Sequence, residues 1–370
     1  MKENKARVIA FYLPQYHPIP ENDKYWGKGF TEWTNVAKAK PLFRGHYQPH
    51  IPADLGFYDL RLPEVREAQA ELARDAGIEG FCYYHYWFGN GKMLLQKPFE
   101  EVLRLGKPDF PFCLCWANHD WTTKTWVKGS SMVNNTMIAQ QDYLGEQDDI
   151  KHFEYCLRAF KDHRYITIEG KPIFLIYDPL SFPNVKEFMN RWNFLAKKNN
   201  LKGIYFIGVT TGRQSSYKIV TNLGFDGVCH NRRWEAEAKA AGFRFVRRMQ
   251  SLLGWHLGIS LMKYDYNKVV RNYDTPENKL ENCYPVITPG FDRTPRAGRR
   301  AGIYVNSSPK NFKKHVAEVC KSIQDKDDDH RLVFLSAWNE WGEGNYMEPD
   351  LKWGHGYLEA LKSVVKFQIK

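Results

Sequence analysis

The chain has 370 residues, 43% of them hydrophobic and 26% charged, which is ordinary for a soluble globular protein. Its formal net charge is +11, but most lysines and arginines are scattered along amphipathic stretches, which indicates solvated faces and argues against a nucleic-acid surface. The seven cysteines form no C-x-x-C pair, so neither a cysteine zinc site nor a disulfide framework is indicated.

The N-terminal apolar run is too short for a secretory signal peptide, and Pro14 interrupts it. No run reaches the ~20 apolar residues that a transmembrane helix needs. We therefore expect a soluble, cytoplasmic protein, or a periplasmic one if a signal peptide has been removed. An odd number of cysteines, with Cys113 and Cys115 as small core residues on one face of a strand, fits a reducing compartment. The oligomeric state is left open.

Eight short apolar runs occur along the chain, and each predicts a β-strand. They span residues 7–13, 80–87, 111–118, 171–178, 203–209, 225–230, 284–292 and 331–339. Helical patterns occupy residues 62–77, 184–200, 307–324 and 355–367. Pro63 and Pro309 stand in first-turn positions, Ser308 is a predicted N-cap, and Gly77 is a predicted helix end.

Strands that alternate with helices predict βαβ units and a parallel sheet. Eight repeats without a glycine-rich dinucleotide loop favour the α/β class with a closed (β/α)8 TIM barrel over an open sheet. The long segments after the first, third and sixth strands are predicted to be elaborated βα loops on a single catalytic domain, residues 1–370. Residues 244–258, in the third of these segments, predict an amphipathic helix packed on the barrel.

Several predicted strands end in polar side chains. These are His85, Asn118, His119, Asp120, Asp178, His230, Asp292, Asn339 and Glu340. In a barrel the carboxyl ends of all strands meet at one face, where the active site lies. The sequence therefore predicts a site of convergent polar groups at that face.

The most informative of these ends is the motif W-N-E-W-G-E-G, which places Glu340 and Glu343 three residues apart after the last strand. Acids at this spacing on a turn or helix have Cβ atoms roughly 5–6 Å apart, and carboxyl groups about 5 Å apart suit a retaining glycosidase. Trp338 and Trp341 offer apolar faces for sugar rings and desolvation that raises the pKa of a neighbouring acid. The alternative is that the two glutamates cap the next segment or pair with arginines.

The stretches "AFYLPQYHPIPEND", "GFCYYHYWF", "PFCLCWAN" and "AWNEWGEGNYMEPD" resemble the WbsX-type family over nearly the whole chain. That family is often labelled glycosyltransferase and occurs among polysaccharide and O-antigen genes. It is related to the glycoside hydrolase family 99 endo-α-mannosidases, which have a (β/α)8 fold. The link to the mannosidases depends mainly on the barrel and on the N-E-W-x-E-G…E-P motif.

The resemblance implies roles for the two glutamates. Glu340 corresponds to the carboxylate that acts on the sugar 2-hydroxyl, and Glu343 to the general acid/base. The relatives retain configuration by attack of the 2-hydroxyl, through an anhydro-sugar intermediate and without a metal or cofactor. This mechanism requires Glu340 ionised and Glu343 protonated at rest.

A wider set of residues is predicted to bind substrate, against the alternative of core or loop packing. The set is Gln15, Tyr16, His17, Glu32, Trp33, Tyr84, His85, Tyr86, Trp116, Asn118, Asp120, Trp121, Asp178, Trp338, Asn339, Trp341 and Glu348. Strand alternation lets only some of residues 84–86 face inward. The family usually reads W-A-N-E-N-W after the third strand, whereas this chain has His119 and Asp120 there, so the sugar-contacting subsite is expected to differ.

Two further patterns are ambiguous. Arg293 and Arg296, with Arg299 and Arg300, follow the seventh strand, where barrels often bind phosphate. They predict a site for an anionic sugar or sugar diphosphate, a solvated basic loop, or partners for acidic side chains. His46 and His50 lack a third ligand in sequence, which argues against a metal site.

Three functions follow, in order of preference. The first is a glycoside hydrolase acting on an α-linked oligosaccharide or polysaccharide. The second is a glycosyltransferase of polysaccharide assembly. The only acidic run, Asp327 to Asp329, precedes the last strand and falls on the opposite face, so it does not supply a transferase metal site. The third is a non-catalytic carbohydrate-binding barrel, which the intact acid pair argues against.

Overall fold

Eight parallel strands close into a barrel. The computed structural model describes residues 6–123, 136–212, 214–241, 249, 253 and 262–365. Around the barrel the strands follow in the order β1, β2, β4, β8, β9, β10, β12 and β14, and β14 pairs with β1 to close the circle. The predicted (β/α)8 barrel is confirmed, and each predicted strand coincides with one barrel strand.

The element bounds are as follows. The barrel strands are β1 (Arg7–Tyr12), β2 (Gly80–Trp87), β4 (Phe112–Trp116), β8 (Lys171–Ile176), β9 (Tyr205–Val209), β10 (Gly227–His230), β12 (Cys283–Ile287) and β14 (Leu332–Leu335). The short strands are β3 (Met93–Leu94), β5 (Trp121–Thr122), β6 (Met137–Ala139), β7 (Thr167–Ile168), β11 (Lys263–Asp265), β13 (Ile303–Val305), β15 (Asn339–Glu340) and β16 (Asn345–Tyr346).

The α-helices are α1 (Pro20–Trp26), α2 (Glu32–Lys38), α3 (Pro63–Asp75), α4 (Lys97–Leu105), α5 (Glu146–Phe160), α6 (Val185–Lys198), α7 (Tyr217–Asn222), α8 (Arg233–Ala240), α10 (Tyr266–Val270), α11 (Thr294–Ala297), α12 (Pro309–Ser322) and α13 (Gly356–Lys362). The 3-10 turns are η2 (Pro179–Ser181), η3 (Pro276–Lys279), η4 (Gly298–Arg300) and η5 (Trp341–Glu343).

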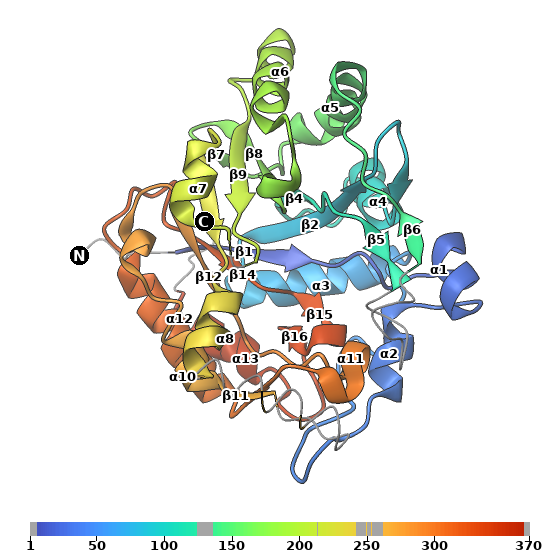
Figure 1. Cartoon of the computed structure of the whole chain (residues 1–370), viewed down its shortest axis with the longest axis vertical. Helices are drawn as coiled ribbons and strands as arrows, with labels where there is room; N and C mark the ends of the chain where they lie inside the picture. Colours follow the sequence, from blue (N-terminus) through green and yellow to red (C-terminus); the bar gives the residue numbers. More distant parts are fainter. Residues whose placement is uncertain are drawn as a thin grey trace.

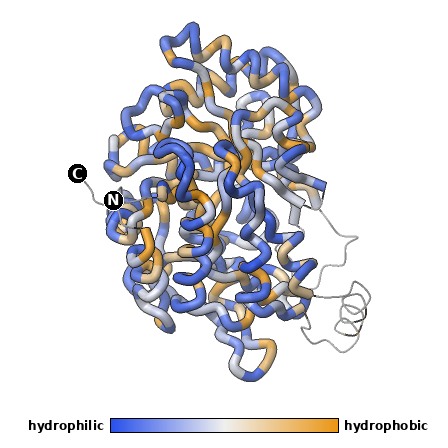
Figure 2. Tube along the Cα trace, turned by 90° about the vertical axis from the view of Figure 1, so that its left-hand side faces the viewer, coloured by the Kyte–Doolittle hydropathy of each residue, from blue (hydrophilic) through white to orange (hydrophobic). Residues whose placement is uncertain are grey.

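The core forms because the barrel strands are apolar on both faces. All residues of β4, β9, β12 and β14 are buried, as expected for parallel strands enclosed by helices. Figure 2 shows hydrophobic segments running through the interior and hydrophilic ones along the surrounding helices. The predicted helix starts are confirmed at α3, with Pro63 in its first turn, and at α12, where the Ser308 side chain accepts a hydrogen bond from the Asn311 amide.

The loops beyond the carboxyl ends of the strands carry most of the extra structure (Figure 1). The segment after β1 holds α1 and α2, the segment after β4 holds the β5–β6 hairpin, and α8 follows β10. These are the three predicted elaborations. A fourth, with α11, η4 and β13, follows β12 and was not predicted. The predicted amphipathic helix at residues 244–258 lies almost entirely outside the described residues.

The opposite end of the barrel is closed by ion pairs. Arg7, at the start of β1, bonds to Glu79 and to the backbone carbonyl of Asp329, and the Asp329 side chain accepts from the Glu169 amide. The acidic run at residues 327–329 therefore lies at the amino ends of the strands, as predicted. None of the described helices is long and apolar enough to cross a membrane.

Candidate active site

The two predicted catalytic glutamates stand on a hairpin that follows β14. β15 and β16 pair antiparallel, with η5 between them. Asn339 fixes the hairpin to the end of β1, because its Oδ1 accepts from the Leu13 amide at 2.8 Å and its Nδ2 donates to the Leu13 carbonyl at 3.0 Å. The buried Asn339 thus has a positioning role, and the prediction that it contacts substrate is corrected.

The tryptophans of the motif do not form a sugar platform. Trp338 and Trp341 are both 0% exposed. Trp341 stacks on Tyr346 with ring centroids 3.7 Å apart, and its Nε1 donates to Glu348. The chain turns back after η5, so these rings face the core and not the opening of the barrel. Their predicted role in substrate binding is wrong for this structure.

Gly342 explains how a third acid reaches the pair. A Cβ atom at this position would overlap the Glu32 carboxylate and would lie 2.9 Å from Arg296 Nε. Only glycine therefore lets Glu32, which comes from α2, approach the backbone of η5. Glu32 is 0% exposed, so it contacts protein groups and its predicted contact with substrate is also corrected.

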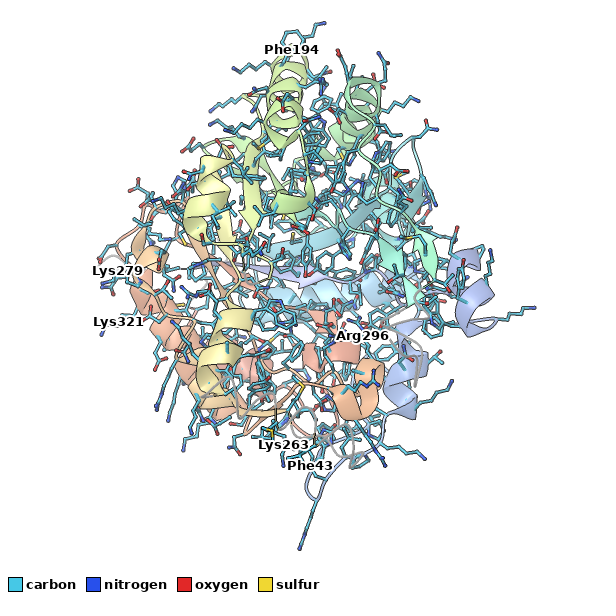
Figure 3. The ribbon with its side chains drawn as sticks, in the orientation of Figure 1. Phe43, Phe194, Lys263, Lys279, Arg296 and Lys321 are labelled. Carbon is cyan, nitrogen blue, oxygen red and sulfur yellow. The ribbon has the colours of Figure 1, made fainter. Side chains whose placement is uncertain are left out.

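Arg296, on α11, joins the three carboxylates. Its guanidinium bonds to Glu32 at 3.0 and 3.1 Å, to Glu340 at 2.9 Å and to Glu343 at 2.8 Å. Figure 3 shows Arg296 beside the ribbon of the hairpin. Two more arginines approach Glu343, with Arg293 at 3.5 Å and Arg233 at 3.7 Å. The predicted pairing of the arginine loop with acidic side chains is thus the arrangement found.

These charges separate the pKa values of the pair. Burial raises the pKa of Glu340 to about 7 against the opposing charge of Arg296, and the nearby Glu343 adds to the rise. Burial also disfavours the charged form of Glu343, but Arg296, Arg293 and Arg233 outweigh it and lower its pKa to about 2. This order is opposite to the expected resting state, because the arginines gather on Glu343 and not on Glu340.

The pair opens into a large cavity at the carboxyl ends of the strands. Its volume is about 1700 Å³, which accommodates an oligosaccharide. Of the predicted site residues, the cavity is lined by Gln15, Tyr84, Tyr86, Asp120, Trp121, Arg293, Arg296, Glu340 and Glu343, together with His119 at the departure from the family pattern. Trp121 stacks on Tyr86 with ring centroids 5.6 Å apart, forming an aromatic wall.

Other predicted binding residues do not line the cavity, and all of them are buried except Asp178, whose carboxylate accepts from the Ser181 hydroxyl. They are Tyr16, His17, Trp33, His85, Trp116, Asn118, Asp178 and Glu348. Asn118 donates to the Tyr143 hydroxyl and the Asp178 carbonyl, and buried Glu348 accepts from Trp341, Gln69 and Tyr58. Their position at strand ends predicts ligand contacts, but their polar groups bond to the backbone and to each other.

Several residues of the cavity wall are not among the predicted site residues. Tyr177 precedes the predicted Asp178, and strand alternation directs the tyrosine inward. Arg233 and Trp234 follow β10 and also line the cavity. Trp234 is 40% exposed and lies shortly after the end of a strand. An aromatic residue at such a position is the sequence feature that could have predicted its place in the cavity wall.

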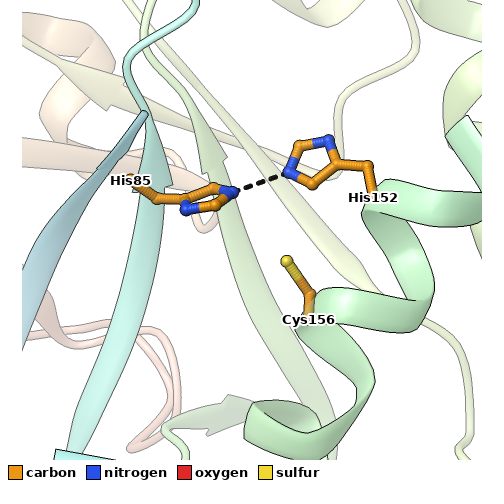
Figure 4. A group of neighbouring side chains, drawn as sticks. All are labelled: His85, His152 and Cys156. Atoms are coloured by element: carbon orange, nitrogen blue, oxygen red, sulfur yellow. Dashed lines mark hydrogen bonds between the residues drawn. The ribbon is translucent and has the colours of Figure 1, made fainter. Parts of the chain in front are cut away.

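His85 lies in a buried cluster with His152 and Cys156 (Figure 4). Among the described residues, this is the group whose ligand atoms could surround one ion. The two Nε2 atoms are 2.8 Å apart, whereas two nitrogens of a tetrahedral zinc site would be about 3.3 Å apart. Burial lowers the pKa of His85 to about 3, so a hydrogen bond between neutral rings explains the contact.

The pair His46 and His50 also has separate partners. His46 Nε2 is 2.7 Å from Asp292, and His50 Nδ1 is 2.9 Å from the Tyr346 hydroxyl. The two rings therefore hold the first loop onto the loops after β12 and β14.

The chain therefore forms a closed (β/α)8 barrel with the glutamate pair at its carboxyl end. Two solved structures share this fold. One, described as a glycoside hydrolase-like protein, is 16% identical with a TM-score of 0.62, over 100% of this chain and 96% of its own. The other, the GH99 endo-α-mannosidase from Bacteroides thetaiotaomicron, is 16% identical with a TM-score of 0.57, over 99% and 97%.

The chain belongs to the WbsX family. The sequence profile described as glycosyltransferase WbsX matches residues 8–361. The uncharacterized protein WxcX of Xanthomonas campestris pv. campestris is 34% identical over 361 residues, which is 97% of this chain and 50% of that protein. The chain thus spans about half the length of the curated relatives it matches. The expected resemblance is confirmed.

Proposed function

We propose that this protein is a retaining glycoside hydrolase that cleaves an α-linked oligosaccharide or polysaccharide, with Glu340 and Glu343 as its catalytic pair. The observation that carries the proposal is that both carboxylates bond to one guanidinium and face a cavity lined by aromatic side chains. Aromatic rings stack on sugars, and paired carboxyl groups perform the proton transfers of glycoside cleavage. The fold shared with the GH99 endo-α-mannosidase supports the same class.

In the proposed reaction Glu340 removes the proton from the substrate 2-hydroxyl, whose oxygen then attacks the anomeric carbon. Glu343 donates a proton to the leaving oxygen, and water later opens the anhydro sugar. A base with a pKa of about 7 is well matched to neutral pH. Glu343 is ionised in the free protein because of its arginines, and the proton of the pair rests on Glu340 below about pH 7. Substrate entry must therefore weaken the bond between Glu343 and Arg296, so that this proton passes from Glu340 to Glu343 and leaves Glu340 as the base.

The direct test is the release of reducing ends from α-mannosides and from polysaccharides whose assembly genes lie near the gene of this protein. We expect release with the wild-type protein and none with Glu343→Gln, with circular dichroism showing that the variant is folded. A leaving group of low pKa needs no protonation, so an aryl α-mannoside should be cleaved by Glu343→Gln and not by Glu340→Gln. The reverse pattern would exchange the two roles.

A second candidate is a glycosyltransferase, which the description of the family favours. The cavity of about 1700 Å³ has room for a sugar nucleotide. The acidic run at residues 327–329 lies at the opposite end of the barrel, which argues against a metal-dependent nucleotide site there. Product formed only from a UDP- or GDP-sugar donor would establish the transferase and refute the hydrolase.

A further inference from the structure

The charges at the glutamate pair are compensated locally. Glu32, Glu340 and Glu343 all bond to Arg296, and Glu343 also lies near Arg293 and Arg233. Arg233 is in addition 3.9 Å from Glu237, whose Oε1 accepts from the Tyr304 hydroxyl. These arginines are therefore occupied by carboxylates of the protein itself.

Four further cations line the same cavity without such partners. They are Lys38, Lys40, Arg299 and Arg300, which we call the basic wall. All four are exposed, and none forms an ion pair with an acidic side chain of the described residues. The internal segments that the structure leaves undescribed contain no aspartate or glutamate, so they supply no acidic partner either.

The basic wall lies on two segments of the chain that pack against each other. Lys38 ends α2 and Lys40 follows it, while Arg299 and Arg300 lie in η4, directly after α11. Helices α2 and α11 pack against each other beside the catalytic hairpin (Figure 1). Arg296, which holds the glutamates, is three residues before Arg299. The four cations therefore belong to the cavity wall next to the catalytic pair.

The acidic side chains of the cavity do not neutralise this wall. Besides the glutamate pair, the cavity is lined by one acid, Asp120, whose Oδ1 accepts from the Gln141 amide at 2.8 Å. Like charges along one side of a cleft concentrate the field there and raise the local concentration of anions. Arginine in particular can donate two parallel hydrogen bonds to two oxygens of one carboxylate or phosphate.

We propose that the basic wall is a subsite for a negatively charged group of the substrate, so that the cavity takes an acidic oligosaccharide bearing a carboxylate or a phosphate. The inference rests on the proposed function for the position of the bond that is cleaved. The charged sugar lies along α2 and η4, and the neighbouring sugar lies over Glu340 and Glu343. A neutral oligosaccharide of the same size leaves four cations of the wall without counter-charge.

The test uses calorimetry to compare the affinities of ligands that differ only in charge. The protein is the full chain carrying Glu343→Gln, so that no ligand is cleaved during the measurement. One arm uses a glucuronic acid–mannose disaccharide and its carboxyl-reduced form. The other uses mannose 6-phosphate and mannose. We expect at least about tenfold tighter binding of the charged member in one arm, because several partly exposed ion pairs add up to this range. The arm that responds identifies the charged group.

Matched variants locate the effect. In the same background, the Lys38→Ala/Lys40→Ala and Arg299→Ala/Arg300→Ala doubles should each reduce the preference for charge several-fold, and Arg299→Lys/Arg300→Lys should retain most of it. The control is Lys279→Ala/Lys321→Ala, two exposed lysines at the opposite edge of the molecule from Arg296 (Figure 3), which should change nothing.

The outcomes separate this inference from the proposed function. Equal binding of charged and neutral ligands, absence of binding in both arms, or a preference that survives both alanine doubles overturns the basic wall as a subsite. If the wild-type protein cleaves neutral α-mannosides and shows no preference for charged ligands, the hydrolase proposal stands and the anionic subsite is refuted. Charge-dependent binding without cleavage of any ligand keeps the subsite and refutes the hydrolase.

Discussion

Replacing Arg296 by glutamine is the sharpest test of the ion cluster. The substitution keeps a long polar side chain but removes the cation that three carboxylates share. The Arg296 side chain is 8% exposed and the Glu32 side chain is 0% exposed, so water replaces the lost charge poorly. Glu32, Glu340 and Glu343 would then repel one another in a buried site, and the folded state should be destabilised.

The expected magnitude follows from this burial. Removing one partner of a buried ion pair costs about 3–5 kcal/mol, because the remaining charge is left without compensation. Unfolding entropies of about 2.1 cal/mol/K per residue give about 0.8 kcal/mol/K for 370 residues. Arg296→Gln should therefore lower the melting temperature by about 4–6 °C at neutral pH.

The assay is thermal and urea unfolding at pH 7.5, completed as a double-mutant cycle with Glu32→Gln. The double variant should lose clearly less stability than the two single losses together, since each single change leaves an unpaired group. Lys279→Gln, at an exposed lysine, serves as the control and should change stability by less than about 0.5 kcal/mol. A loss below about 1 kcal/mol for Arg296→Gln, or strict additivity in the cycle, would refute the shared buried cluster.

Three further outcomes are expected. Burial raises the pKa of Glu348 from 4.5 to about 7. The contribution of the protonated Glu348 to the free energy of unfolding is therefore full below pH 4.5 and is lost as the pH rises through 7. Melting temperatures measured from pH 5 to 8 should fall less steeply in Glu348→Gln than in the wild-type protein. Trp234→Ala should weaken oligosaccharide binding in calorimetry about tenfold with little change in melting temperature, because this ring lines the cavity and is 40% exposed. Gly342→Ala should lower the melting temperature and abolish activity, because its Cβ would displace Glu32 from Arg296.

The fold could be predicted from the sequence because its signals are local and repeated. Each barrel strand is an apolar run of a few residues, and the helix starts at Pro63 and Ser308 carry their own capping chemistry. The position of Glu340 and Glu343 at the carboxyl end of the barrel could be predicted as well, since they directly follow the last strand, whereas their catalytic role stays a prediction. In both cases neighbours in sequence decide the structure.

The rest of the site depends on contacts between distant segments. The residues next to Trp341 in sequence do not determine whether its ring faces a sugar or stacks on Tyr346. The orientation of the ring depends on how the hairpin folds back after η5. Glu32 and Arg296 are 264 residues apart in sequence, so their ion pair leaves no local pattern. The expected order of pKa values failed for the same reason, because three arginines from two loops meet at Glu343.

The ion cluster is better explained by chemistry than by stability. Arg296 joins loops that follow β12, β14 and β1, which are neighbours in the barrel. An apolar cluster of the same volume would tie these loops together equally well, because buried ion pairs often gain little over hydrophobic packing. What the apolar cluster would lack is a pair of carboxyl groups with separated pKa values beside a cavity. Glu340 and Glu343 hold one proton between them from about pH 2 to about pH 7. The cluster thus carries the one proton that the proposed reaction needs, and this proton must pass from Glu340 to Glu343 when the substrate binds.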